Sequence, residues 1–183
     1  MSTRYQQAYA ASDFSTAGGI MLITSVDFLN GGGKLAPSTY SLYFSTITAG
    51  IDTLSNVNFD SNRGADNTLF ATLTLDGTAP PTLTFSGAPF FYNPAHGNLL
   101  LDIVVSPGGV DANGGFGANY LSNESASGVF SRYHNFGSGN YGWGLVTQFD
   151  YQAVPEPTVT AFICVALLLA GTSRRWVVFP SKN

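Results

Sequence analysis

The chain has 183 residues, a net charge of −4 and only 10% charged residues. This length is typical of one domain, and it is enough to bury a sizeable core. Up to position 153, four basic side chains stand against ten acidic ones, so this part carries a net charge near −6. An acidic balance of this kind excludes the basic surface by which proteins bind nucleic acid.

Short segments that alternate between apolar and polar residues recur along the first 151 positions, separated by turns rich in Gly, Pro and Asn. The predicted strands are 4–9, 20–29, 39–47, 68–75, 82–85, 98–105, 116–121, 128–133 and 144–151. A single helical turn is predicted at 51–54. Without amphipathic helices to cover a sheet, this pattern favours an all-β fold, an antiparallel β-sandwich with jelly-roll-like connections.

Two of these strands allow finer predictions. Residues 98–105 are almost continuously apolar, which is typical of a central strand covered on both faces. Residues 68–75 alternate strictly, so Leu69, Ala71, Leu73 and Leu75 are expected on one face.

The character of the sequence changes after position 157. Residues 158–173 contain no charge, and as a helix they would span about 24 Å against a hydrocarbon layer of about 30 Å. Arg side chains that reach toward the headgroups can absorb this deficit, so we predict a transmembrane helix. The alternative is a buried C-terminal helix of a soluble domain. The single cysteine, Cys164, lies in this segment, so the body forms no internal disulfide.

The residues on either side of the apolar segment suggest its orientation. Arg174 and Arg175 follow it directly, and positive charge stays on the cytoplasmic side, so the body is expected to face outward. Before the segment, Pro155 and Pro157 disfavour helix at the residues that precede them and hold Val154 and Glu156 extended. An extended, exposed segment is what a protease binds through its backbone.

The succession of Val154, Pro155, Glu156 and Pro157, an apolar helix and a basic pair resembles the PEP-CTERM sorting signal, also catalogued as the ice-binding protein C-terminal domain. The resemblance implies recognition by exosortase, a membrane-embedded cysteine-type protease of Gram-negative bacteria. It also implies cleavage near the Pro-Glu-Pro motif and release to the cell surface or the exopolysaccharide matrix. Members of the family usually end in a longer basic cluster, whereas here apolar residues 176–179 follow the arginines.

The resemblance extends to the body, in segments 4–7, 64–68, 91–102 and 144–149, where it carries no assigned activity. It implies an extracytoplasmic β-sandwich domain over 1–152 and a sorting signal over 153–183. Members of the family normally have a secretory leader, and none opens this sequence. We therefore expect the true start to lie upstream, or the gene to be truncated.

No catalytic residue is predicted. There is no G-x-S-x-G motif, and His96 and His134 are the only imidazoles, with His96 expected as a polar residue of a turn. The predicted role is therefore structural or adhesive, without chemistry of its own and without a bound cofactor.

Two binding alternatives remain open. Asp60, Asn62 and Asp66 place side-chain oxygens in one loop, as calcium sites do, although Asp and Asn in loops also form turns without metal. Four aromatic residues gather late in the body among Gly, Ser and Asn, and they could bind carbohydrate or pack in the core. They are Tyr120, Tyr133, Tyr141 and Trp143. A carbohydrate- or exopolysaccharide-binding module is thus the alternative function.

Overall fold

The computed structural model describes residues 3–29, 37–78, 80–106, 122–124, 130–134, 140–141 and 143–155. Its strands are β1 (Thr3–Tyr9), β2 (Met21–Leu29), β3 (Ser38–Ile47), β4 (Thr68–Leu75), β5 (Thr82–Tyr92), β6 (Asn98–Ser106), β7 (Ser122–Glu124), β8 (Phe130–His134), β9 (Asn140–Tyr141), β10 (Trp143–Leu145) and β11 (Thr147–Ala153). Four short 3₁₀ helices accompany them: η1 (Ala11–Ala17), η2 (Ile51–Thr53), η3 (Phe59–Asn62) and η4 (Pro94–His96).

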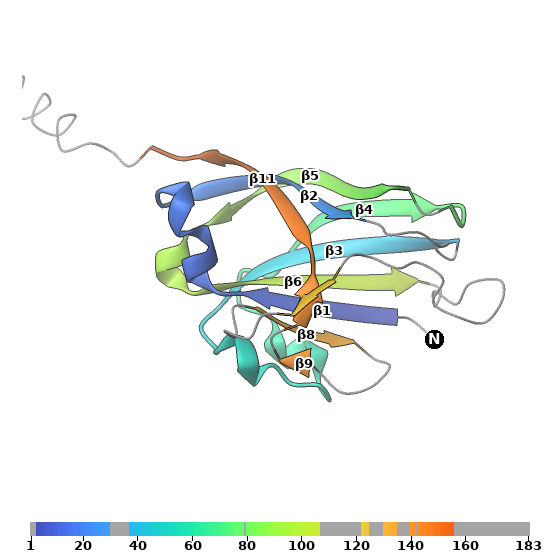
Figure 1. Ribbon diagram of the computed structural model, residues 1–183, viewed down its shortest axis with the longest axis horizontal. Helices are drawn as coiled ribbons and strands as arrows, with labels where there is room; N and C mark the ends of the chain where they lie inside the picture. Colours follow the sequence, from blue (N-terminus) through green and yellow to red (C-terminus); the bar gives the residue numbers. More distant parts are fainter. Residues whose placement is uncertain are drawn as a thin grey trace, which may run out of the picture.

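The strands form two main antiparallel sheets that lie one over the other (Figure 1). The larger has the order β4-β3-β6-β1-β8-β9, the smaller the order β11-β2-β5, and β10 pairs with β7 separately. The chain passes repeatedly from one layer to the other, since β1, β3, β4 and β6 belong to the larger sheet and β2 and β5 to the smaller. The predicted all-β fold with antiparallel sheets is confirmed.

The core fills the space between the layers with side chains from alternate strand positions, as half-buried strands require. Ile23 and Phe85 come from the smaller sheet and Leu42 and Leu101 from the larger, and all four are almost completely buried. Phe14 of η1 closes one end of this layer. Its ring lies edge-on to the rings of Tyr9, Tyr92 and Phe149, at centroid distances of 6.4, 5.1 and 5.5 Å.

The second face of the larger sheet is covered by the connection between β3 and β4. Ile51, Leu54 and Phe59 of this connection pack on Ala8 of β1 and Leu100 of β6. Both faces of β6 are therefore buried, which confirms the central strand predicted from its continuous apolar sequence.

The prediction for residues 68–75 is wrong at its first position. The pairing of β4 with β3 shifts register so that Leu42 faces Ala71 and Tyr43 faces Leu69, leaving Phe70 as an extra residue. This bulge turns Phe70 into the core, where its ring lies 4.9 Å from that of Phe44. Leu69 is consequently 48% exposed.

Four other predicted elements differ from the structure or lie outside it. β5 continues to Tyr92, seven residues beyond the predicted end, and the single strand predicted at 144–151 is two strands that divide at Val146. The predicted strand 116–121 and the apolar segment 158–173 lie outside the described residues. Within the described part, no helix has the length and hydrophobicity needed to cross a membrane.

Candidate functional site

The predicted sorting motif begins where β11 ends. β11 is an edge strand of the smaller sheet and pairs with β2 as far as Ala153, opposite Met21. The last backbone hydrogen bond runs from the N–H of Val154 to the carbonyl of Ile20, over 2.9 Å. Pro155 follows with an exposed side chain and no N–H to donate, so pairing stops there. Glu156, Pro157, Arg174 and Arg175 lie outside the described residues.

The three predicted calcium ligands each hold the loop that covers the larger sheet. Asp60 forms ion pairs with the guanidinium groups of Arg4 and Arg63, at 2.9 and 3.1 Å. Asn62 is buried, and its amide oxygen accepts from the N–H of Ser55 over 2.7 Å. In the part of the chain that the structure covers, no three His, Cys, Asp or Glu side chains come together as a metal site would need. Calcium binding stays a prediction, and an ion would compete with these contacts.

Asp66, the third predicted ligand, is exposed and lies apart from this network. Its Oδ1 accepts from the backbone N–H of Thr46 over 2.8 Å, which ties the end of the loop to β3. Gly64 nearby has no room for a side chain, because a Cβ there would lie 1.9 Å from the carbonyl oxygen of Thr46.

An ion-pair network that the sequence analysis did not predict anchors the same loop. Asp102 of β6 is 1% exposed and accepts from Nε and Nη2 of Arg4, at 2.9 and 2.7 Å, and from Nε of Arg63 at 2.7 Å. The guanidinium of Arg63 also lies over the ring of Tyr43, 5.1 Å from its centroid. The hydrogen bond from Arg4, more than its charge, lowers the pKa of Asp60. A lone carboxylate inside an apolar strand was the signal for this network, since a buried charge requires partners.

The inner face of β1 is also unexpectedly polar. Gln7 is completely buried, and its side-chain oxygen accepts from the N–H of Leu145 over 2.8 Å and from the hydroxyl of Tyr5. The hydroxyl of Tyr9 lies 2.6 Å from that of Thr147, and burial raises the pKa of Tyr9 well above its usual value. These bonds fasten the segment that leads into β11 to the middle of the larger sheet.

The predicted carbohydrate residues lie on different short strands. Tyr133 belongs to β8 and Tyr141 to β9, which pair at one edge of the larger sheet with Ser131 opposite Tyr141. Trp143 belongs to β10, opposite Glu124 of β7. Tyr120 lies outside the described residues. Adjacent strands therefore bring two of the four residues near each other, and carbohydrate binding by this group stays a prediction.

His96 lies in η4 with an exposed side chain, and its Nε2 is 3.4 Å from the amide nitrogen of Asn93. Its predicted place in a polar turn is confirmed. His134 is the last residue of β8.

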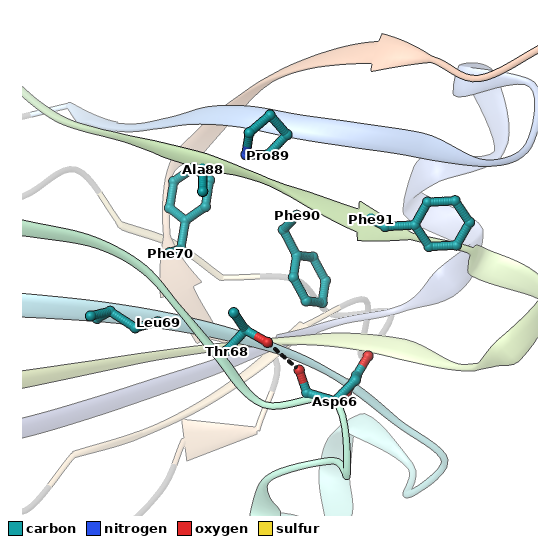
Figure 2. A pocket seen from close by; sticks show the side chains of 8 residues that line it. All are labelled: Asp66, Thr68, Leu69, Phe70, Ala88, Pro89, Phe90 and Phe91. Carbon is teal, nitrogen blue, oxygen red and sulfur yellow. Dashed lines mark hydrogen bonds between the residues drawn. The ribbon is translucent and has the colours of Figure 1, made fainter.

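The last candidate for a functional site is a hollow between β4 and β5, which the sequence did not predict (Figure 2). Its volume is about 340 Å³, and it combines two exposed apolar side chains with a carboxylate.

Comparison of the chain with models of known protein families, with curated proteins and with solved structures gives no match. The resemblance to PEP-CTERM proteins therefore stays a prediction from the residues that carry it.

Proposed function

We propose that the chain is an exported β-domain that an exosortase-type membrane protease sorts through the C-terminal signal, for delivery to the cell surface or the extracellular matrix. The observation that carries this proposal is the position of Val154 and Pro155. The pairing of the smaller sheet ends at Val154, and Pro155 is exposed, so the motif starts directly at the surface of the domain.

The local chemistry around this point supports access by a protease. A protease binds its substrate as an extended strand, and proline at 155 and 157 restricts the backbone to extended conformations. β11 supports this geometry because its residues Tyr151 to Ala153 are exposed at the edge of the sheet. The predicted transmembrane helix over 158–173 and the arginines after it would hold the motif close to the membrane.

For the body we propose a structural or adhesive role in the matrix, without catalysis. The support is a closely packed aromatic core, closed at one end by Phe14, and a long loop fixed to the sheet by Asp102. The jelly-roll-like connectivity expected from the sequence stays a prediction, as does the membrane span.

The test is a release assay in a Gram-negative host that encodes an exosortase, with the chain fused behind a secretory leader. We expect the unaltered chain to appear in the medium in a shortened form. Glu156→Gln and Pro157→Ala should instead accumulate at full length in the membrane fraction. Pro81→Ala, at an exposed proline of another connection, is the matched control and should be released normally. Unchanged release of the motif variants, or equal release from a host without exosortase, would contradict the proposal.

A further inference from the structure

The hollow between β4 and β5 lies where the edges of the two sheets meet (Figures 1 and 2). It is lined by Asp66, Thr68, Leu69, Phe70, Ala88, Pro89, Phe90 and Phe91. Its volume of 340 Å³ falls in the lower part of the range of small-ligand sites, about 300–1,000 Å³. A site of this size accommodates one or two rings of a ligand rather than a folded partner.

Two irregular pairings produce the hollow. On β5, Gly87, Ala88 and Pro89 stand opposite the single residue Thr24 of β2, because Ser86 pairs with Ser25 and Phe90 with Ile23. On β4, the extra residue is Phe70. The two bulges touch at Gly87, where a Cβ would lie 1.7 Å from the carbonyl oxygen of Phe70. Bulges bend strands and redirect side chains, and here Pro89 and Leu69, beside the two bulges, are part of the lining of the hollow.

The hollow offers apolar surface that the fold leaves open. Phe91 is 53% exposed and Leu69 48% exposed, and Figure 2 shows them at opposite ends of the hollow. Between them, Phe90 points from β5 toward β4 and is almost completely buried. A phenyl ring and a leucine on opposite sides of a depression supply flat apolar contact, which a polar ligand with an apolar face can use.

The polar part of the hollow is a carboxylate in a fixed orientation. Oδ1 of Asp66 accepts from the N–H of Thr46, whereas Oδ2 makes no hydrogen bond within the described part of the chain. The hydroxyl of Thr68 donates to the carbonyl oxygen of Asp66 over 2.7 Å and so orders the same turn. The site thus presents one strong acceptor whose direction is set before any ligand arrives.

We propose that this hollow binds an uncharged hexopyranose unit of a polysaccharide. The sugar's C–H face would lie on the ring of Phe91, and one of its hydroxyls would donate to Oδ2 of Asp66. A uronate unit is disfavoured, because Asp66 and a body charge near −6 repel a carboxylate. These residues differ from the aromatic group predicted from the sequence, and the site does not depend on the sorting signal.

The experiment measures binding of the full chain to soluble dextran, mannan and galactan by affinity electrophoresis, with alginate as the polyuronate comparison. An amine-oxide detergent keeps the chain in solution, since a detergent with a sugar headgroup would compete. We expect at least one neutral polysaccharide to bind, and Phe91→Ala to weaken it about tenfold. Asp66→Asn should weaken it several-fold, because Asn keeps an acceptor for Thr46 but replaces Oδ2 with a donor.

Tyr151→Ala is the matched control, since this aromatic residue is 41% exposed on β11 but does not line the hollow. It should bind like the unaltered chain. The proposal is overturned if none of the neutral polysaccharides binds, or if alginate binds as tightly as they do. It is equally overturned if binding survives Phe91→Ala and is lost in Trp143→Ala, which would place the site in the sequence-predicted group. None of these results depends on whether the release assay succeeds.

Discussion

Replacing Asp102 with Asn tests whether the ion-pair network holds the loop to the larger sheet. The side chain is 1% exposed and accepts three charge-assisted hydrogen bonds of 2.7–2.9 Å. Asn preserves the shape, so no cavity forms, but it removes the charge that two arginines face. Removing one partner of a buried ion pair costs about 3–5 kcal/mol. Arg4 and Arg63 remain 18% and 25% exposed and can partly rehydrate, so we expect a loss of about 3 kcal/mol, at the lower end of that range.

The assay is urea denaturation of the full chain at pH 7, with Asp52→Asn as control because Asp52 is exposed in the same loop. The control should change the free energy of unfolding by less than about 0.5 kcal/mol. A loss below about 1 kcal/mol for Asp102→Asn would show that the network contributes no more than a surface ion pair and would refute the reasoning. Replacing the whole network by Arg4→Met, Arg63→Met and Asp102→Leu should recover most of the stability, because no buried charge is then left alone.

Three further predictions concern the bulges and the loop. Gly87→Ala should lower the free energy of unfolding by at least about 2 kcal/mol, since its Cβ would clash with a backbone oxygen. Gly50→Ala should change it by less than about 0.5 kcal/mol, since a Cβ there would make only ordinary van der Waals contact with Thr53. Equal effects of the two substitutions in urea denaturation would contradict the close approach at Gly87. In the same assay, Phe70→Ala should lower the free energy of unfolding by about 3–5 kcal/mol, because Phe70 is buried, and Leu69→Ala by less than about 1 kcal/mol, because Leu69 is half exposed. The reverse order would mean that the β4 bulge is absent. The pKa of Asp60 is lowered in the folded state, so its contribution is present above the unfolded pKa of about 3.9 and is lost as pH falls through the lower folded value. In thermal melts recorded at decreasing pH, the midpoint temperature of Asp60→Asn should therefore fall less steeply at acid pH than that of the unaltered chain. An equally steep fall would contradict a stabilising ion pair at Asp60.

The sequence predicted the strands well where the alternation is regular or the apolar run continuous. β6 was placed at the centre of a sheet because a strand so apolar must be covered on both faces. The alternation in β4 predicts the wrong face for Leu69. The bulge that changes this face depends on the pairing register with β3, and the alternation within one strand gives no information about that register. Likewise, the predicted strand 82–85 is too short because Gly and Pro, which usually end strands, occur here at Gly87 and Pro89 within a bulge that β5 continues through.

The candidate sites could be predicted only where they are contiguous in the sequence. The start of the proposed sorting motif is such a case, since Val154 and Pro155 adjoin each other. The ion-pair network joins residues that are 98 positions apart, and the hollow joins two strands through their irregularities. Such sites depend on how the chain folds back on itself, and no spacing within one segment predicts them.

The central position of β1 has a consequence for how the protein assembles. Tyr5 pairs with Ile103 of β6 on one side and with His134 of β8 on the other. The first strand therefore has no neighbour until nearly a hundred further residues have been synthesised, which takes about 5–20 s at about 5–20 residues per second. Pairing across such separations also makes folding slow. During this interval the early part of the chain cannot close its sheet, and its unpaired strand edges remain available to chaperones.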